Sequence, residues 1–104
     1  MDLVLNQSNS STNQVTAVVA PYIIAAGDYS ILADTTAGTF SVVLPASASS
    51  GGRLIHVKKT DASANVVTII GRNGELVEDA ITQPLTRQGE NLMLICDGSQ
   101  WRVL

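Results

Sequence analysis

The sequence predicts an all-β domain, a small antiparallel sandwich or barrel of about eight short strands. Its apolar runs are short and rich in β-branched residues, as expected of strands. Clusters of Gly, Ser, Asn, Asp and Pro separate these runs at roughly the 8–12-residue spacing of sandwiches and barrels. No segment has an apolar stripe at helical period, so no helix is expected.

Residues 1–20 are predicted to form a polar N-terminal arm or linker, and residues 21–104 the β domain. Residues 6–14 consist only of Asn, Gln, Ser and Thr. A segment of that composition buries too little apolar surface to offset the entropy lost on ordering. We therefore expect an arm that is flexible or that pairs with a neighbouring subunit.

The first strands of the domain are expected on either side of a proline. Pro21 interrupts the apolar run at residues 15–24, so one strand should end near residue 20 and another begin near residue 22. Residues 28–33 then alternate in polarity between two clusters of turn residues. This alternation predicts a strand with one apolar face.

Three apolar runs between residues 40 and 71 form the centre of the predicted fold. Pro45 ends the first run, because proline has no N–H for a β ladder. The third run, at residues 66–70, is apolar on both faces, as expected of a strand covered on both sides. One small chain with few aromatic residues has little to cover both faces with, so a partner subunit is expected. The candidate subunit interface consists of Ile55, Val57, Val67 and Ile69.

The C-terminal third is predicted to contain two hairpins. The Asn-Gly pair at residues 73–74 favours two positive φ angles and hence a tight hairpin. Residues 81–87 contain a proline, which restricts them to an edge strand or an irregular segment. A strand is expected at residues 91–96. The Asp-Gly pair at residues 97–98 should then turn the chain into a last strand at residues 101–104.

Composition favours an oligomer over a monomer. Charged residues make up 14% of the 104 residues, against about 25% in a typical domain, and the net charge is −3. A chain this short of charge is expected to hide surface in subunit contacts. The negative charge argues against nucleic-acid binding. The sequence contains no run of about 20 apolar residues, so membrane insertion is not expected.

The sequence predicts no enzyme activity, no cofactor and no metal site within one chain. His56, the only histidine, lies in mid-strand without a nucleophile motif nearby. It is expected to pair with a cross-strand neighbour, and the alternative is an ion bound by three copies in a threefold assembly. Cys96, the only cysteine, is expected to be a small buried hydrophobe.

The charged residues are interpreted as surface groups. Glu78 and Asp79 would point apart on a strand and keep an exposed edge soluble. Arg53, Lys58 and Lys59 form a basic cluster, expected on a solvated face or in intersubunit ion pairs.

Three residues are candidate ligand contacts. Trp101 and Tyr29 could stack on a sugar, with Asn73 contributing from a loop. The competing and favoured interpretation of Trp101 is a core or interface anchor.

Four segments resemble a known family in their order and spacing. They are Gly-Asp-Tyr-Ser-Ile-Leu-Ala at residues 27–33, Val-Val-Leu-Pro-Ala at 42–46, residues 52–65 with Lys-Lys-Thr-Asp at 58–61, and residues 96–104 with Asp-Gly followed by Trp. Over about residues 22–104 the chain resembles the β domains of bacteriophage tail fibres, tail spikes and related virion appendages.

The resemblance implies a structural virion protein, a homotrimeric β domain that builds or caps a fibre. It implies further contacts with other virion proteins through the N-terminal arm and with a host-surface glycan. Pro45 then corresponds to the strand-ending proline, residues 58–61 to a strand-to-turn corner, and residues 97–98 with Trp101 to the terminal hairpin. The alternative function is a monomeric carbohydrate-binding module that uses Trp101 and Asn73.

Overall fold

The computed structural model describes residues 11–104, which form strands and short 3₁₀ turns. The predicted all-β class is confirmed as mainly β. The strands are β1 (Ser11–Thr16), β2 (Tyr22–Ile23), β3 (Asp28–Asp34), β4 (Phe40–Val43), β5 (Leu54–Lys59), β6 (Val67–Ile70), β7 (Thr82–Leu85), β8 (Asn91–Cys96) and β9 (Trp101–Val103). The 3₁₀ turns are η2 (Ala17–Val19), η3 (Ser47–Ser49) and η4 (Arg72–Gly74).

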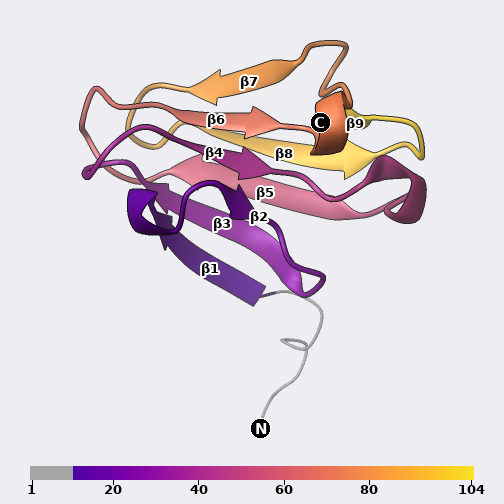
Figure 1. Cartoon of the computed structure of the whole chain (residues 1–104), viewed down its shortest axis with the longest axis horizontal. Coiled ribbons are helices and arrows are strands. Elements are labelled where there is room, and N and C mark those ends of the chain that lie inside the picture. Colours follow the sequence, from indigo (N-terminus) through magenta and orange to yellow (C-terminus); the bar gives the residue numbers. More distant parts are fainter. Residues whose placement is uncertain (1–10) are drawn as a thin grey trace, which may run out of the picture.

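The strands form two sheets that pack face to face (Figure 1). Sheet A has the order β1-β3-β5-β8-β9, and sheet B has the order β2-β4-β6-β7. The shortest extent of the molecule is 22 Å. This thickness fits two sheets about 10 Å apart with side chains on both outer faces.

The first six strands alternate between the sheets, so the chain winds in three coils in the manner of a β-solenoid. Each coil places one strand in each sheet: β1 with β2, β3 with β4, and β5 with β6. Strands of successive coils are therefore parallel neighbours. Antiparallel pairs occur only with the last three strands: β8 pairs with β5 and β9, and β7 pairs with β6.

The predicted antiparallel arrangement is thus wrong for the pairs among the first six strands and right for the pairs made by β7, β8 and β9. In an antiparallel meander each turn joins neighbours in one sheet, but here the turns between the first six strands carry the chain across to the other sheet. The next strand in the same sheet comes one coil later and runs in the same direction. The local apolar pattern is the same in both arrangements, because side chains alternate with period two either way.

The core lies between the sheets and contains all four residues predicted at a subunit interface. Ile55, Val57, Val67 and Ile69 are each 0% exposed within the single chain. Their assignment to an interface is wrong, because sheet-on-sheet packing supplies the cover that the sequence analysis gave to a partner. The other face of β6, with Thr68 and Ile70, is only half-buried.

The predicted polar arm is wrong where the structure describes it. Ser11–Thr16 form β1, which pairs parallel with β3, and Val15 of this strand is buried in the core. Although β1 is polar, its N–H and carbonyl groups form hydrogen bonds with β3, and Val15 is its one buried apolar side chain. These contacts hold the strand in the fold without an apolar sequence pattern. Residues 1–10 of the expected arm lie outside the described residues.

The turn predictions have mixed outcomes. The hairpin at residues 97–98 is confirmed, since it joins the antiparallel pair β8 and β9. β7 is an edge strand of sheet B, as the proline predicted. Asn73 and Gly74 have the expected positive φ angles, 52° and 81°. The tight hairpin is wrong, however, because Ile70 pairs with Thr82 and the intervening residues reach across to β9.

A buried ion pair forms the corner after β5. The side chain of Lys59 is 0% exposed and that of Asp61 8% exposed. The Lys59 ammonium donates to Asp61 Oδ2 at 3.0 Å, to the Asp61 carbonyl at 2.9 Å and to the Ser63 carbonyl at 3.0 Å. All three protons of the ammonium can therefore be used, which offsets the cost of taking the charge out of water.

The same corner holds the preceding coil through Thr35, which is fully buried. Its N–H donates to Asp61 Oδ1 at 2.6 Å, and its carbonyl accepts from Asn65 Nδ2 at 2.8 Å. Burial alone would raise the pKa of Asp61, but hydrogen bonds from Ser63, Thr35 and Lys59 outweigh it, and the pKa is lowered. The carboxylate thus stays ionised at neutral pH and joins two coils.

Replacing Lys59 with methionine should destabilise the fold strongly. Lys59→Met leaves the Asp61 carboxylate buried without its cation, and breaking a buried pair in this way costs about 3–5 kcal/mol of unfolding free energy. Urea unfolding at neutral pH measures the loss. The control is Lys58→Met in the same strand, whose half-buried side chain points outward and should change stability by no more than about 0.5 kcal/mol. Equal effects of the two changes would contradict the role of the pair.

Acid should weaken the same corner. The pKa of Asp61 is lower in the folded chain than in the unfolded chain, where an aspartate titrates near about pH 4. Its contribution to stability is therefore present above that pH and is lost as the pH falls below it. We expect Asp61→Asn to be less stable than wild type at neutral pH and to lose less stability on acidification. Urea midpoints over a pH series test this, and parallel curves would contradict it.

Candidate interaction surfaces

The strands of sheet B carry no charged side chain. The four strands of this sheet contain no Asp, Glu, Lys, Arg or His. One aliphatic row crosses three strands, because Ile23 pairs with Val43 and Val43 with Ile70. Ile23 is 52% exposed and the other two are half-buried. We define the B face by its outward residues: Ile23, Ser41, Val43, Thr68, Ile70, Thr82 and Pro84.

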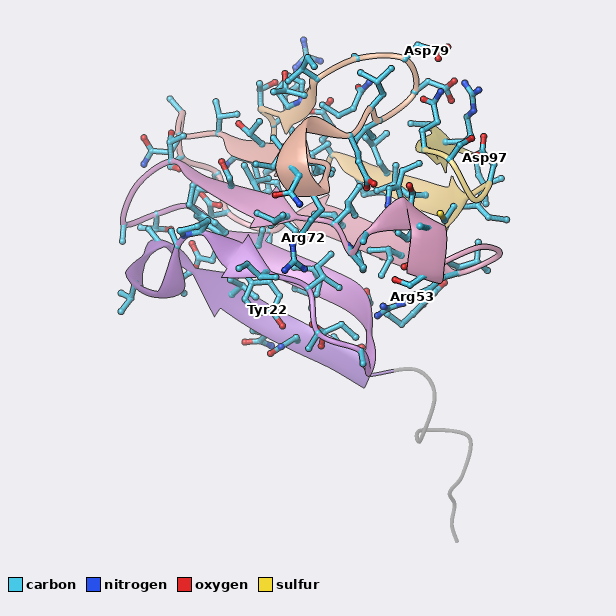
Figure 2. All side chains as sticks on the ribbon, turned by 45° about the vertical axis from the view of Figure 1, so that its right-hand side comes forward. Tyr22, Arg53, Arg72, Asp79 and Asp97 are labelled. Atoms are coloured by element: carbon cyan, nitrogen blue, oxygen red, sulfur yellow. The ribbon has the colours of Figure 1, made fainter. Side chains whose placement is uncertain are left out.

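The outer side of sheet A differs from the B face because it carries charge. At one end of it, Arg102 lies 3.2 Å from Glu78, 3.1 Å from Asp79 and 3.1 Å from Asp97. Figure 2 shows Asp79 and Asp97 near each other on the side of the molecule that carries β9. These groups are largely exposed, so the ion pairs contribute little to stability.

The prediction that Glu78 and Asp79 point apart is wrong, since both carboxylates contact Arg102. Both have left-handed backbone conformations, with φ angles of 49° and 63°, in the turn that precedes β7. Residues in such a turn do not alternate as they would on a strand, so both carboxylates reach Arg102. Hydrogen bonds from the N–H groups of Gln100 and Ser99, and then from Arg102, lower the pKa of Asp97.

His56 pairs with cross-strand neighbours, as predicted. Its Nδ1 lies 3.0 Å from Ser30 Oγ on β3, and its Nε2 lies 3.2 Å from Asn91 Oδ1 on β8. Both ring nitrogens thus contact side chains of the same sheet. An ion bound by three copies of His56 would have to displace one of them, and that alternative stays a prediction.

The predicted ligand residues do not form one site. Trp101 is 0% exposed, and its Nε1 donates to the Pro45 carbonyl at 3.0 Å. It is therefore a core anchor, and its prediction as a sugar platform is wrong. Tyr29 is half-buried at the outer side of sheet A, with its hydroxyl 3.7 Å from Met93 Sδ. Asn73 is exposed in η4, which follows a strand of sheet B.

The predicted basic cluster is divided by the fold. Arg53 donates to the carbonyls of Ala25 and Asp28 at 2.7 and 2.8 Å, so it braces the turn before β3. Lys59 is buried, and Lys58 points outward from the same strand. A shared solvated face or intersubunit role for the three is wrong, because alternation along β5 separates the two lysines. Cys96 is buried, as predicted, with its Sγ 3.3 Å from the Ser47 carbonyl.

A polar cluster in the first coil was not predicted. The Tyr22 hydroxyl donates to the buried Asp28 carboxylate and accepts from Asn13 Nδ2 at 2.6 Å. Burial, followed by the hydrogen bond and charge of Asp28, raises the pKa of Tyr22 to about 12. The cluster joins β1 of sheet A to β2 of sheet B. Asn13, Tyr22 and Asp28 come from three different strands, so no local sequence pattern predicted that they would meet.

A shallow, open depression of about 190 Å³ lies on the outer side of sheet A, next to β1. Its lining consists of Gln14, Val15, Thr16, Leu32, Asp34 and Thr60. Two hydrogen bonds from Thr36 lower the pKa of Asp34, so this lining is anionic at neutral pH. Among residues 11–104 no three His, Cys, Asp or Glu side chains are grouped to hold a metal, and no helix is long and apolar enough to cross a membrane.

No protein-family model matches the chain, and a search of curated proteins finds no match.

The fluorescence of Trp101 should not respond to sugars. Trp101 is the only tryptophan and is fully buried. Titration with glucose, galactose or N-acetylglucosamine should leave its emission unchanged, and acrylamide should quench it weakly until the chain is unfolded in urea. A saturable change in emission on adding one of these sugars to the folded chain would contradict the buried position.

Proposed function

We propose that this chain is a non-enzymatic structural domain of a virion appendage, such as a phage tail fibre or spike, and that it assembles as a homotrimer through the B face. The resemblance supports the class of protein. The charge-free B face is the single observation on which the mode of assembly rests.

The residues that gave the resemblance lie in structural positions of the kind it implies. Pro45 follows β4, residues 58–61 end β5 and begin the buried corner, and residues 97–98 turn the chain toward Trp101. Each position has a physical requirement: a strand end, a compensated buried charge and a hairpin. The agreement at these three positions supports the proposal.

Threefold assembly puts a specific demand on the shared surface. Side chains near a threefold axis meet their own copies, so any charge there faces two like charges. Interface cores are accordingly depleted of charged residues. The B face meets this demand and adds an aliphatic row, with Ile81, which is 60% exposed, directly before β7. It is a better candidate interface than the charged outer side of sheet A.

The proposal places the protein in the virion, in contact with other virion proteins through its N-terminal segment and with a host-surface glycan. These partners rest on the resemblance. The alternative of a monomeric carbohydrate-binding module has less support, because its main platform, Trp101, is in the core.

Light scattering should give a mass about three times the 10.9 kDa of one chain. Ile70→Asp places a carboxylate on the B face of every copy, and repulsion should reduce the mass to that of a monomer. Thr68→Asp, on the same strand and face, is a second variant that removes no apolar side chain. Circular dichroism and Trp101 fluorescence check that each variant is folded.

The matched control is Ile95→Asp, at a half-buried outward position on β8 of sheet A. It should leave the trimer intact. A wild-type monomer at all concentrations, or trimers that persist in both B-face variants, would overturn the proposed assembly.

A further inference from the structure

The two ends of the sandwich differ in whether the edge strands can pair with a further strand. The strand orders place β1 and β2 at one end and β9 and β7 at the other (Figure 1). In Figure 2, Tyr22 of β2 and Asp79 lie on opposite sides of the molecule. The hydrogen bond from Asn13 to the Tyr22 hydroxyl shows that β1 and β2 face each other at their end.

The end formed by β9 and β7 is closed. The N–H and carbonyl of Trp101 pair with residues of the preceding turn, at 3.2 Å to the Leu76 carbonyl and 2.7 Å from the Glu78 N–H. Glu78 also accepts the N–H of Val103 at 2.9 Å. On sheet B, Pro84 lies within β7 and cannot donate to a further strand. Both edges therefore resist addition of another strand.

The end formed by β1 and β2 is open. Within the part of the chain that the structure describes, β1 pairs only with β3 and β2 only with β4. β1 is six residues long and contains no proline and no charged residue. Its pairing with β3 is irregular only between Ser11 and Thr12, so from Thr12 to Thr16 it lacks the usual features that prevent a further strand from pairing.

Exposed apolar side chains adjoin this open end. Val18, in η2 between the two strands, is 86% exposed, and Ile23 of β2 is 52% exposed. An unpaired backbone edge beside apolar surface is the combination used in strand addition, where main-chain hydrogen bonds and side-chain burial act together.

We propose that the β1 edge pairs antiparallel with the β1 edge of a second copy, so that sheet A continues across a two-fold axis. A two-fold axis sets each strand against its own sequence. For a charged strand this would be repulsive, but β1 offers Thr12, Gln14 and Thr16 on one face, whose hydroxyl and amide groups can pair across the strands. The β1 edge adjoins the B face only at Ile23, and Ile70 lies two strands away on β6, so a change at Ile70 separates this association from the trimer.

Sedimentation velocity on the full chain tests the pairing. Raising the concentration should double the mass of whatever unit the chain forms when dilute. The variant Thr12→Lys/Gln14→Lys adds two exposed cations to each edge, and like charges across the two-fold axis should abolish the doubling. Its control is Ala48→Lys/Ala62→Lys, with the same added charge at exposed positions in η3 and in the turn after β5.

Hydrogen exchange distinguishes a second copy at the β1 edge from residues 1–10 of the same chain. Amides of β1 that are free in the dilute protein should become protected as the mass doubles. Protection without any change in mass would mean that residues 1–10 of the same chain occupy the edge, and it would overturn the proposal. A mass that never doubles, or one that doubles equally in the Thr12→Lys/Gln14→Lys variant, would also overturn it.

The outcome is independent of the trimer. Ile70→Asp, designed to give a monomer, should still double in mass if the edge pairs. Loss of the trimer with retained doubling would contradict neither proposal, whereas a wild-type trimer that does not double would remove the edge pairing alone.

Discussion

The buried pair of Lys59 and Asp61 is the constraint on which the rest of the structure depends. A charge inside a small β sandwich is tolerated only when its partners are complete, and here they come from two coils. A shift of β3 against β5 by one residue would move Thr35 away from the carboxylate and leave both charges short of partners. The pair therefore fixes the register in which the second and third coils stack. That register sets which side chains face the core.

Stacked coils give this domain two kinds of surface with different chemistry. Side chains that point away from the core form broad faces, and the face of sheet B is uncharged while that of sheet A is not. Strand edges form the ends: the last three strands close one end, whereas within residues 11–104 no strand pairs with the outer edge of the first coil. Association through a face buries side chains, whereas association through an end extends a sheet by main-chain hydrogen bonds.

Local chemistry made several features predictable. Pro45 ends β4, the Asp-Gly pair makes the hairpin between β8 and β9, and Cys96 is buried, each because the requirement lies within a few residues. The predicted interface and ligand residues were mostly wrong. The favoured interpretation of Trp101, a core or interface anchor, is confirmed for the core, whereas its use as a ligand contact is wrong. The subunit interface was placed on core residues, and the cluster of Tyr22 and Asp28 was missed. These errors share one cause: each depends on segments that meet only after the chain has crossed from one sheet to the other.

The sequence by itself determined the strand content, the positions of most turns and the scarcity of charge, because these follow from residue type and local order. Only the tertiary structure decided that successive strands lie in opposite sheets and that β1 belongs to the fold. It also decided which apolar face of β6 is covered: Val67 and Ile69 lie in the core, while Ile70 lies on the B face. Alternation gives a strand two faces, but only the packing of one sheet on the other selects the face that leaves water.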